Sequence, residues 1–249
     1  MSRPAELHIM TKAAEKAAFN LVRDFGELER LQVSKKGFGN FVTTADKKSE
    51  ERIVYELSKS RPEFSLLCEE SGFIERENKT TYWVIDPIDG TTNFMRGIPY
   101  FAINIALVEE NDPVAALTLD PMRGDHFKAD VGGGAFLGNR NRIRVSRKDS
   151  ISESVVATHI WHENDSKLFE SGAILRRTGS IALDLAYLAS GKYDVVIAEN
   201  VQLWDIAAGI LLVKEAGGFL EYTKNSNGKY DIRAAASSKL LKAVSEILK

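Results

Sequence analysis

The sequence predicts an α/β protein with two lobes, and three observations support that prediction. Apolar residues recur at helical spacing between Met10 and Phe25. Short apolar segments separated by turn residues, as in a series of β-strands, fill the stretch from Phe64 to Val131. Strand-like and helix-like segments then alternate from Val155 onward. The chain has 249 residues, 44% of them hydrophobic, which is enough for one large domain or two fused lobes with a substantial core.

The N-terminal lobe is predicted to contain two helices and five strands. Pro4 can lie in the first turn of the first helix, where no backbone N–H is needed. A loop at Gly37–Asn40 precedes a second helix, for which Thr44 is the expected N-cap. Pro87 is expected to end a strand, because proline cannot donate to the hydrogen-bond ladder. The expected strands are Phe64–Cys68, Trp83–Ile85, Phe101–Val108, Pro113–Leu119 and Asp125–Val131.

Three other stretches of this lobe are predicted to lie outside the strands. The polar run Glu75–Thr81 and the glycine run Gly132–Gly134 are expected to be loops. The glycine run lacks the Lys-Ser/Thr pair of a phosphate-binding P-loop, so its expected role is structural. The basic run Asn139–Arg147 is assigned to solvated surface.

The C-terminal lobe is expected to span residues 149–249, after an N-terminal lobe of residues 1–148. Ser180 is the expected cap of one of its helices and Gly191 the residue that ends it. Asn227-Gly228 predicts a turn. The expected strands are Val155–Ile160 and Tyr193–Ala198, and the expected helices are Ile181–Ser190, Asp205–Glu215 and Ser238–Leu248.

The segment Trp83–Phe94 carries the most specific chemical signal in the sequence. Its apolar strand ends in Asp86 and Asp89, and open α/β sheets bind ligands at the carboxyl ends of their strands. Two close carboxylates repel unless a cation or a proton joins them, and Mg²⁺ prefers carboxylate oxygen. The free backbone N–H groups of Gly90–Thr92 follow and could face an anion.

A simpler interpretation of this segment has to be weighed. Asp and Asp-Gly are ordinary turn residues, and Asp before Thr can be a helix cap. For an isolated D-x-x-D-G sequence, a turn or cap would be a better explanation than a metal site. The full string D-P-I-D-G-T-T-N-F after a hydrophobic strand is far more restrictive.

Two other acidic residues complete a candidate constellation. Glu69 follows a predicted strand, and Asp205 stands at the start of a predicted helix. Alone, Glu69 could be a solvated strand end and Asp205 an N-cap. Together with Asp86 and Asp89 they form a candidate oxygen-rich metal site drawn from three separate segments.

These motifs resemble those of the inositol monophosphatase family, whose members are Mg²⁺-dependent phosphomonoesterases. The resemblance covers nearly the whole chain, and its specific motifs are the acidic turn and Trp204–Gly209. It implies a two-lobed, layered α-β-α-β-α sandwich of the inositol monophosphatase/fructose-bisphosphatase type. Supporting segments in the expected order are Val42–Asp46, Glu69–Ser71, Gly132–Ser146, Arg177–Ser180 and Glu215–Gly218.

The resemblance also implies roles for individual residues. Thr91 and Glu69 orient the attacking water, with Asp46 hydrogen-bonded to the Thr91 hydroxyl. The implied ligands of two or three Mg²⁺ ions are Glu69, Asp86, the carbonyl of Ile88, Asp89 and Asp205. The residues implied to line the substrate site are Lys35, Glu69, Ile88, Asp89, Gly90, Thr91, Gly179, Ser180, Ile181 and Asp205.

One position departs from the pattern of inositol-specific relatives. They have a substrate-binding Glu seven residues before the Trp-Asp aspartate, where this chain has Ala198. A small shift of the loop could bring Glu199 into that role. Otherwise the inositol assignment weakens while the phosphatase assignment stands. Cys68 replaces a Gly common in relatives and is expected to change packing, not metal chemistry.

The charge, the cysteine content and the lack of long apolar stretches argue against nucleic-acid and membrane partners. The formal net charge is −2, which gives no basic surface for nucleic acid or an acidic membrane. Cys68 is the only cysteine, so an intrachain disulfide is impossible. No apolar stretch is long enough for a bilayer, and charged residues interrupt any N-terminal leader. These features predict a soluble, cytoplasmic protein, and the resemblance adds a homodimer and sensitivity to Li⁺.

The expected function is hydrolysis of a small phosphorylated polyol, with myo-inositol monophosphate as the first candidate. Phosphatases acting on histidinol phosphate, a sugar bisphosphate or a phosphoadenosine nucleotide share the metal motif and are alternatives. A non-catalytic regulatory relative is an alternative of another class. The complete set of acidic residues together with Thr91 argues against it.

Overall fold

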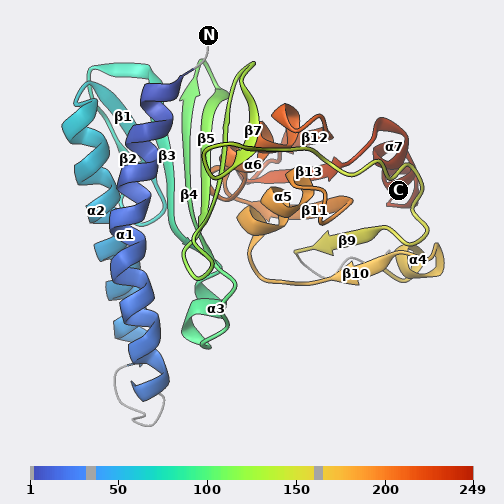
Figure 1. The fold of residues 1–249 in the computed structure, drawn as a ribbon, viewed down its shortest axis with the longest axis horizontal. Coiled ribbons are helices and arrows are strands. Elements are labelled where there is room, and N and C mark those ends of the chain that lie inside the picture. The colour runs from blue at the N-terminus through green and yellow to red at the C-terminus, as the bar shows by residue number, and fades with distance from the viewer. Residues whose placement is uncertain (1–2, 32–37, 160–164, 249) are drawn as a thin grey trace.

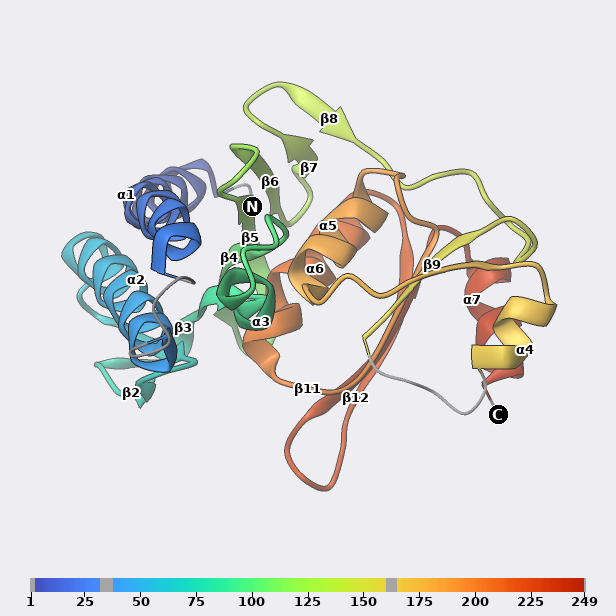
Figure 2. The same ribbon diagram turned by 90° about the horizontal axis from the view of Figure 1, so that it is seen from below.

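The computed structural model describes residues 3–31, 38–159 and 165–248 of the chain. These residues form five layers, in the order helices, sheet, helices, sheet, helices (Figures 1 and 2). This order confirms the predicted α-β-α-β-α sandwich. The outer helices on one side are α1 (Pro4–Leu31) and α2 (Phe38–Ser60), the central ones α5 (Ile181–Ala189) and α6 (Leu203–Glu215), and those on the other side α4 (Asp165–Glu170) and α7 (Ser238–Ile247).

The first sheet has eight strands in the order β2-β1-β3-β4-β5-β6-β7-β8. Its only parallel pair is β1 with β3, and every other pair is antiparallel. The short helix α3 (Thr91–Met95) follows β3. The strands are β1 (Phe64–Cys68), β2 (Gly72–Ile74), β3 (Asn78–Asp89), β4 (Ala102–Glu109), β5 (Asp112–Asp120), β6 (Asp125–Asp130), β7 (Gly134–Leu137) and β8 (Asn141–Ile143).

The second sheet has five strands in the order β10-β9-β11-β13-β12. β10, β9 and β11 are parallel, whereas β13 runs antiparallel to both of its neighbours. The interval between β8 and β9 contains the predicted lobe boundary at residues 148 and 149, which stays a prediction. The strands are β9 (Val155–Thr158), β10 (Ile174–Arg176), β11 (Val195–Val201), β12 (Phe219–Lys224) and β13 (Tyr230–Ala235).

The eight-stranded sheet is apolar on both faces, because helices cover both. Alternate residues of a strand point to opposite faces. Val84 and Ala106 therefore belong to the core shared with α5 and α6, and Ile85 and Leu107 to the core beneath α1 and α2. Within the described residues, no helix has the length and apolar character needed to cross a membrane.

The second helix begins earlier than predicted. α2 starts at Phe38, so the predicted loop is wrong for residues 38–40, and Thr44 lies inside the helix instead of capping it. Gly39 lies in the first turn of this 23-residue helix and does not interrupt its interior.

The strand that carries the acidic turn is longer than predicted at both ends. Residues 78–81 belong to β3 and not to a loop, because they pair with neighbouring strands. Pro87 does not end the strand. The register jumps from Asp86 opposite Asn104 to Asp89 opposite Ala102, so Pro87 lies in a bulge where the ladder requires no donor.

Several short elements carry too weak a sequence pattern to have been predicted. β7 and β8 form a hairpin that was not predicted, and Gly134, the last residue of the predicted glycine loop, already belongs to β7. β8 lies within the predicted basic surface run, where residues 139–142 are exposed as expected. The glycine loop is tied to α6, since Glu215 accepts the N–H groups of Gly132 at 2.8 Å and Gly134 at 2.9 Å. Ile160, the predicted end of a strand, lies outside the described residues.

Buried polar side chains join the N-terminal sheet to the C-terminal lobe. The amide of Asn93 donates to the carbonyl oxygens of Tyr100 and Thr178, both at 2.7 Å. The carboxylate of Asp184, on α5, accepts hydrogen bonds from the hydroxyls of Tyr100 at 2.9 Å and Thr178 at 2.7 Å. Burial raises the pKa of Asp184 from 3.8 to about 7, although these two donors act in the opposite direction.

This pKa predicts that Asp184→Asn flattens the pH dependence of stability. A folded-state pKa above the unfolded one means that the folded protein holds this proton more tightly, so deprotonation at rising pH disfavours folding. Asp184 should therefore lower the free energy of unfolding by about 2 kcal/mol between pH 5 and pH 8. Denaturant unfolding of parent and variant at both pH values measures the difference. The same pH-dependent loss in both proteins would contradict the prediction.

Candidate active site

Three predicted metal ligands converge at the carboxyl end of β3, an interior strand of the eight-stranded sheet. Carboxylate oxygens of Asp86, Asp89 and Asp205 all lie within 4.8 Å of one another. The first two come from the carboxyl end of β3, and Asp205 comes from the first turn of α6. Asp86 is 2% exposed and Asp89 7% exposed, so the first two approach each other with little water between them.

Glu69 reaches the same site from the neighbouring strand. β1 and β3 are parallel, with Cys68 opposite Ile85, and the N–H of Glu69 donates to the carbonyl of Ile85 at 3.2 Å. The charge of Glu69 is among the causes that raise the pKa of Asp86, so the two carboxyls lie close together. Parallel strands that end side by side therefore place Glu69 and Asp86 together, as the sequence predicted.

Local hydrogen bonds fix the shape of the acidic turn. The N–H of Ile88 donates to Asp86 Oδ1 at 2.9 Å, and the Ser49 hydroxyl of α2 donates to the Pro87 carbonyl at 3.3 Å. Gly90 follows with a left-handed backbone, at φ 95°. A Cβ at Gly90 would lie 3.2 Å from the carbonyl oxygens of Gly179 and Tyr100, so only glycine fits without displacing backbone.

Asp89 connects the turn to the C-terminal lobe. Its Oδ2 accepts hydrogen bonds from the Ser180 hydroxyl and from the N–H of Ala182, the latter at 2.8 Å. Ser180 is also the N-cap of α5, as predicted, and accepts from the N–H of Leu183. The predicted substrate residues Gly179, Ser180 and Ile181 thus lie beside Asp89, but the side chains of Ser180 and Ile181 are buried.

Asp205 is held by the start of its own helix. Gln202 is the N-cap of α6, and its N–H donates to Asp205 Oδ2 at 2.7 Å. Asp205 therefore occupies the third helical position, where an acidic side chain can reach back to the cap in a capping box. This geometry replaces the simpler interpretation of Asp205 as the N-cap itself.

The pKa values of these four carboxyls are all raised, which favours binding of a cation among them. Burial, reinforced by the neighbouring carboxylates, raises the pKa of Asp86 well above its ordinary value and that of Asp89 to about 8. Burial likewise raises the pKa of Glu69 to about 7 and that of Asp205 to about 6. A divalent cation would reverse these shifts by binding the ionised form. The all-oxygen donor set fits a hard cation such as Mg²⁺.

The predicted hydrogen bond between Asp46 and Thr91 is not formed. The Thr91 hydroxyl donates to the Ile88 carbonyl at 3.0 Å, because that oxygen lies three residues earlier in the same turn. Asp46, on α2, is 5% exposed, and its Oδ1 has no hydrogen-bond partner in the described part of the chain. Burial and the charges of Glu69, Glu70 and Glu50 raise the pKa of Asp46 to about 7.

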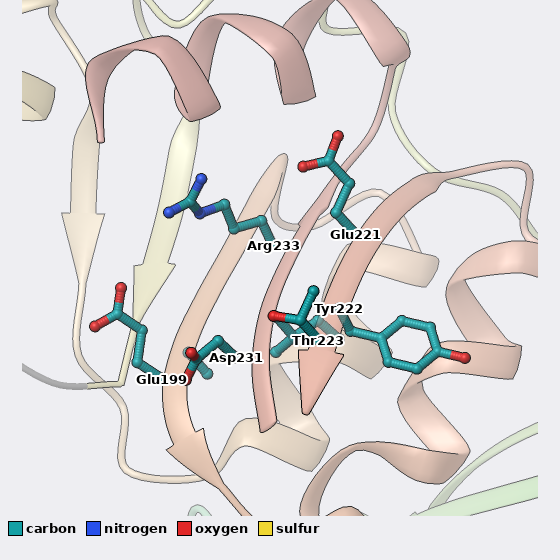
Figure 3. A pocket seen from close by; sticks show the side chains of 8 residues that line it. Glu199, Glu221, Tyr222, Thr223, Asp231 and Arg233 are labelled. Carbon is teal, nitrogen blue, oxygen red and sulfur yellow. The ribbon is translucent and has the colours of Figure 1, made fainter. Parts of the chain in front are cut away.

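Two other residues were predicted to contact the substrate, and the structure places one of them. Lys35 lies outside the described residues. Ala198 is buried with the residues of the central helices, and Glu199 belongs to the other face of β11. Figure 3 shows Glu199 on the same side of the sheet as Arg233 and Glu221, which line a hollow of about 220 Å³. The loop shift that would substitute Glu199 for the missing glutamate is therefore not observed.

Glu50 is a site-supporting residue that the sequence analysis missed. Its buried carboxylate accepts the N–H groups of Glu70 at 2.8 Å and Ser71 at 3.0 Å, which fixes the turn after Glu69. A signal was present, because Asp46 and Glu50 are four residues apart and so share the helix face that also buries Ile53.

Comparisons with known proteins agree with this geometry. Residues 5–248 match the inositol monophosphatase family. An inositol-1-monophosphatase of Caulobacter vibrioides is 43% identical over 84% of this chain and 86% of the relative. A Nus factor SuhB of Xylella fastidiosa is 38% identical over 88% of this chain and 82% of the relative. The crystal structure of the extragenic suppressor protein suhB from Bartonella henselae has a TM-score of 0.87 at 39% identity and covers 98% of both chains.

Proposed function

This chain belongs to the inositol monophosphatase family, and on that premise we propose that it hydrolyses a small phosphomonoester with the help of Mg²⁺. The observation that carries the proposal is that carboxylate oxygens of Asp86, Asp89 and Asp205 lie within 4.8 Å of one another, with the charge of Glu69, from a third segment, close to Asp86. Relatives named inositol-1-monophosphatase support the reaction class. A homodimer and a cytoplasmic location remain predictions.

We assign the metal to the residues that surround this charge. Mg²⁺ bound there would neutralise negative charge on the phosphate and lower the pKa of a coordinated water. The assigned ligands are Glu69, Asp86, the carbonyl of Ile88, Asp89 and Asp205. The number of ions, two or three, is part of the proposal.

The remaining residues are assigned to orienting the phosphate and the attacking water. The N–H groups of Gly90 and Thr91 begin α3, where a helix leaves its first donors without internal partners, and they face the phosphate. Glu69 and the Thr91 hydroxyl orient the attacking water. That water gains a bond to phosphorus as the bond between phosphorus and the ester oxygen breaks; the water loses one proton and the leaving oxygen takes up one, so the step balances. Phosphoryl transfer depends on such positioning and charge neutralisation more than on a protein nucleophile.

We propose a polyol monophosphate as substrate, with myo-inositol monophosphate the first candidate. Ala198 supports a broader selectivity than that of a strict inositol phosphatase, because it offers no carboxylate to substrate hydroxyls. Histidinol phosphate, a sugar bisphosphate and a phosphoadenosine nucleotide are the alternatives for a substrate panel.

A regulatory role without catalysis is the second candidate. Relatives 38–39% identical to this chain carry the name Nus factor SuhB. Asp86, Asp89, Thr91, Glu69 and Asp205 are all present, which favours the enzyme. Turnover of a generic phosphomonoester separates the two candidates.

The proposal predicts turnover that depends on Mg²⁺ and on Asp205. Chelator should abolish hydrolysis, and Asp205→Asn should lower kcat at least about 100-fold, because a removed ligand weakens metal binding. Asp149→Asn is the matched control, since Asp149 is an exposed surface aspartate paired with Lys239. Full activity in excess chelator would exclude the metal mechanism.

Thr91→Ala should lower kcat much more than it raises KM. The hydroxyl is assigned to the transition state, whereas alanine keeps the N–H assigned to phosphate binding. Thr91→Ser keeps a hydroxyl and should retain most of kcat. Steady-state kinetics of the three proteins provide the measurement, and equal kcat in parent and Thr91→Ala would refute the assigned role.

Li⁺ in the millimolar range should inhibit turnover at limiting Mg²⁺. A small monovalent cation can occupy a carboxylate site without supplying the charge that the leaving oxygen needs. Rates measured with LiCl and with matched NaCl test this expectation. Equal rates would remove the Li⁺ prediction and leave the phosphatase proposal in place.

Selectivity between inositol phosphate and glycerol phosphate should be weak. A buried carboxylate that accepts a substrate hydroxyl discriminates strongly, because an analogue without that hydroxyl leaves the charge unpaired. With Ala198 in that place, we expect the two kcat/KM values to agree within about tenfold. Glu199→Ala should leave both unchanged, since Glu199 lies on the other face of β11. A strong inositol preference that disappears in Glu199→Ala would contradict this account.

A further inference from the structure

A row of buried polar side chains crosses the eight-stranded sheet beneath the start of α6. Asp86 is the cross-strand partner of Asn104, and Asn104 is the partner of Thr118. Cross-strand partners lie on the same face of a sheet. Asn104 is 1% exposed and Thr118 0% exposed, on the face where neighbouring positions are apolar.

Asn104 binds the backbone of the helix that carries Asp205. Its Nδ2 donates to the carbonyl oxygen of Trp204 at 2.7 Å and to that of Asp205 at 3.3 Å. The side chain therefore bridges β4 and the first turn of α6, which belong to segments about 100 positions apart in the chain.

Thr118 satisfies the other end of the Asn104 amide, whose orientation is fixed by the two carbonyl groups. The Thr118 hydroxyl donates to Asn104 Oδ1 at 2.7 Å. Backbone carbonyls can only accept, so the NH₂ group has to face Trp204 and Asp205 and the amide oxygen has to face Thr118. The Asn104 amide and the Thr118 hydroxyl are both buried, so breaking the contact between them leaves a polar atom without water to replace its partner.

We propose that Asn104, held in place by its hydrogen bond from Thr118, is a positioning residue that sets the place of Asp205 relative to Asp86. The hydrogen bonds of the Asn104 side chain go to backbone carbonyls and to Thr118, and not to a ligand carboxylate. It joins the strand next to β3 to the backbone of Asp205, so it defines the distance between carboxylates that reach the site from different segments. The inference rests on the proposed metal-dependent function and names one source of that site's geometry.

Binding of Mn²⁺, followed by electron paramagnetic resonance, tests this role without relying on catalysis. Mn²⁺ takes the same oxygen ligands as Mg²⁺. Asn104→Ala and Thr118→Val should each weaken Mn²⁺ binding about tenfold, as loss of a group that orients metal ligands does. Thr118→Ser keeps the hydroxyl and should bind Mn²⁺ like the parent.

Ser65→Ala is the matched control for loss of a buried hydroxyl. Ser65 lies on β1 of the same sheet, is 0% exposed and donates to the Asn78 carbonyl at 2.7 Å. It should lower the melting temperature of the metal-free protein and leave Mn²⁺ affinity unchanged. Should Asn104→Ala fail to fold, the comparison of Thr118→Val with Thr118→Ser decides the question.

The outcomes separate this inference from the function on which it rests. Parent-like Mn²⁺ affinity in Thr118→Val, or equal weakening in Thr118→Ser, overturns the positioning role alone. A parent protein that binds no Mn²⁺ and hydrolyses no phosphomonoester overturns the proposed function and the inference together.

Discussion

Mutual repulsion among Glu69, Asp86, Asp89 and Asp205 is the constraint on which the rest of the structure depends. Burial removes the water that would otherwise separate these charges, so each carboxyl has a pKa above its ordinary value. The fold has to supply enough interactions elsewhere to hold them together. A cation that binds only the folded arrangement would add to stability by mass action.

Hydrogen bonds between segments provide much of that restraint. Asp89 accepts from Ser180 and Ala182, which fixes the acidic turn against the start of α5. Asn93 bridges the carbonyl groups of Tyr100 and Thr178 across the same junction. The two central helices are covered by a sheet on each side, so a shift of either lobe would disturb these buried contacts as well as the apolar core.

The two lobes contribute different parts of the site. The N-terminal lobe supplies Glu69 and the turn from Asp86 to Thr91, which together form the proposed metal and phosphate half. The C-terminal lobe supplies Asp205 and the segment beside Asp89. At the end of β11, where we propose that substrate choice is decided, the buried methyl of Ala198 faces the central layer while Glu199 faces away from it.

The sequence by itself determined the fold class, the order of the main elements and the acidic residues at the site. These features depend on local patterns, namely strands that end in carboxylates and a helix with Asp205 in its first turn, which chain neighbours alone specify. Tertiary structure decided the bulge at Pro87, the partner of the Thr91 hydroxyl and the face on which Glu199 lies. It also decided the supporting contacts of Glu50 and Asn104. Each of these depends on register or on a partner far along the chain, and a one-residue change of register moves a strand side chain to the other face of the sheet.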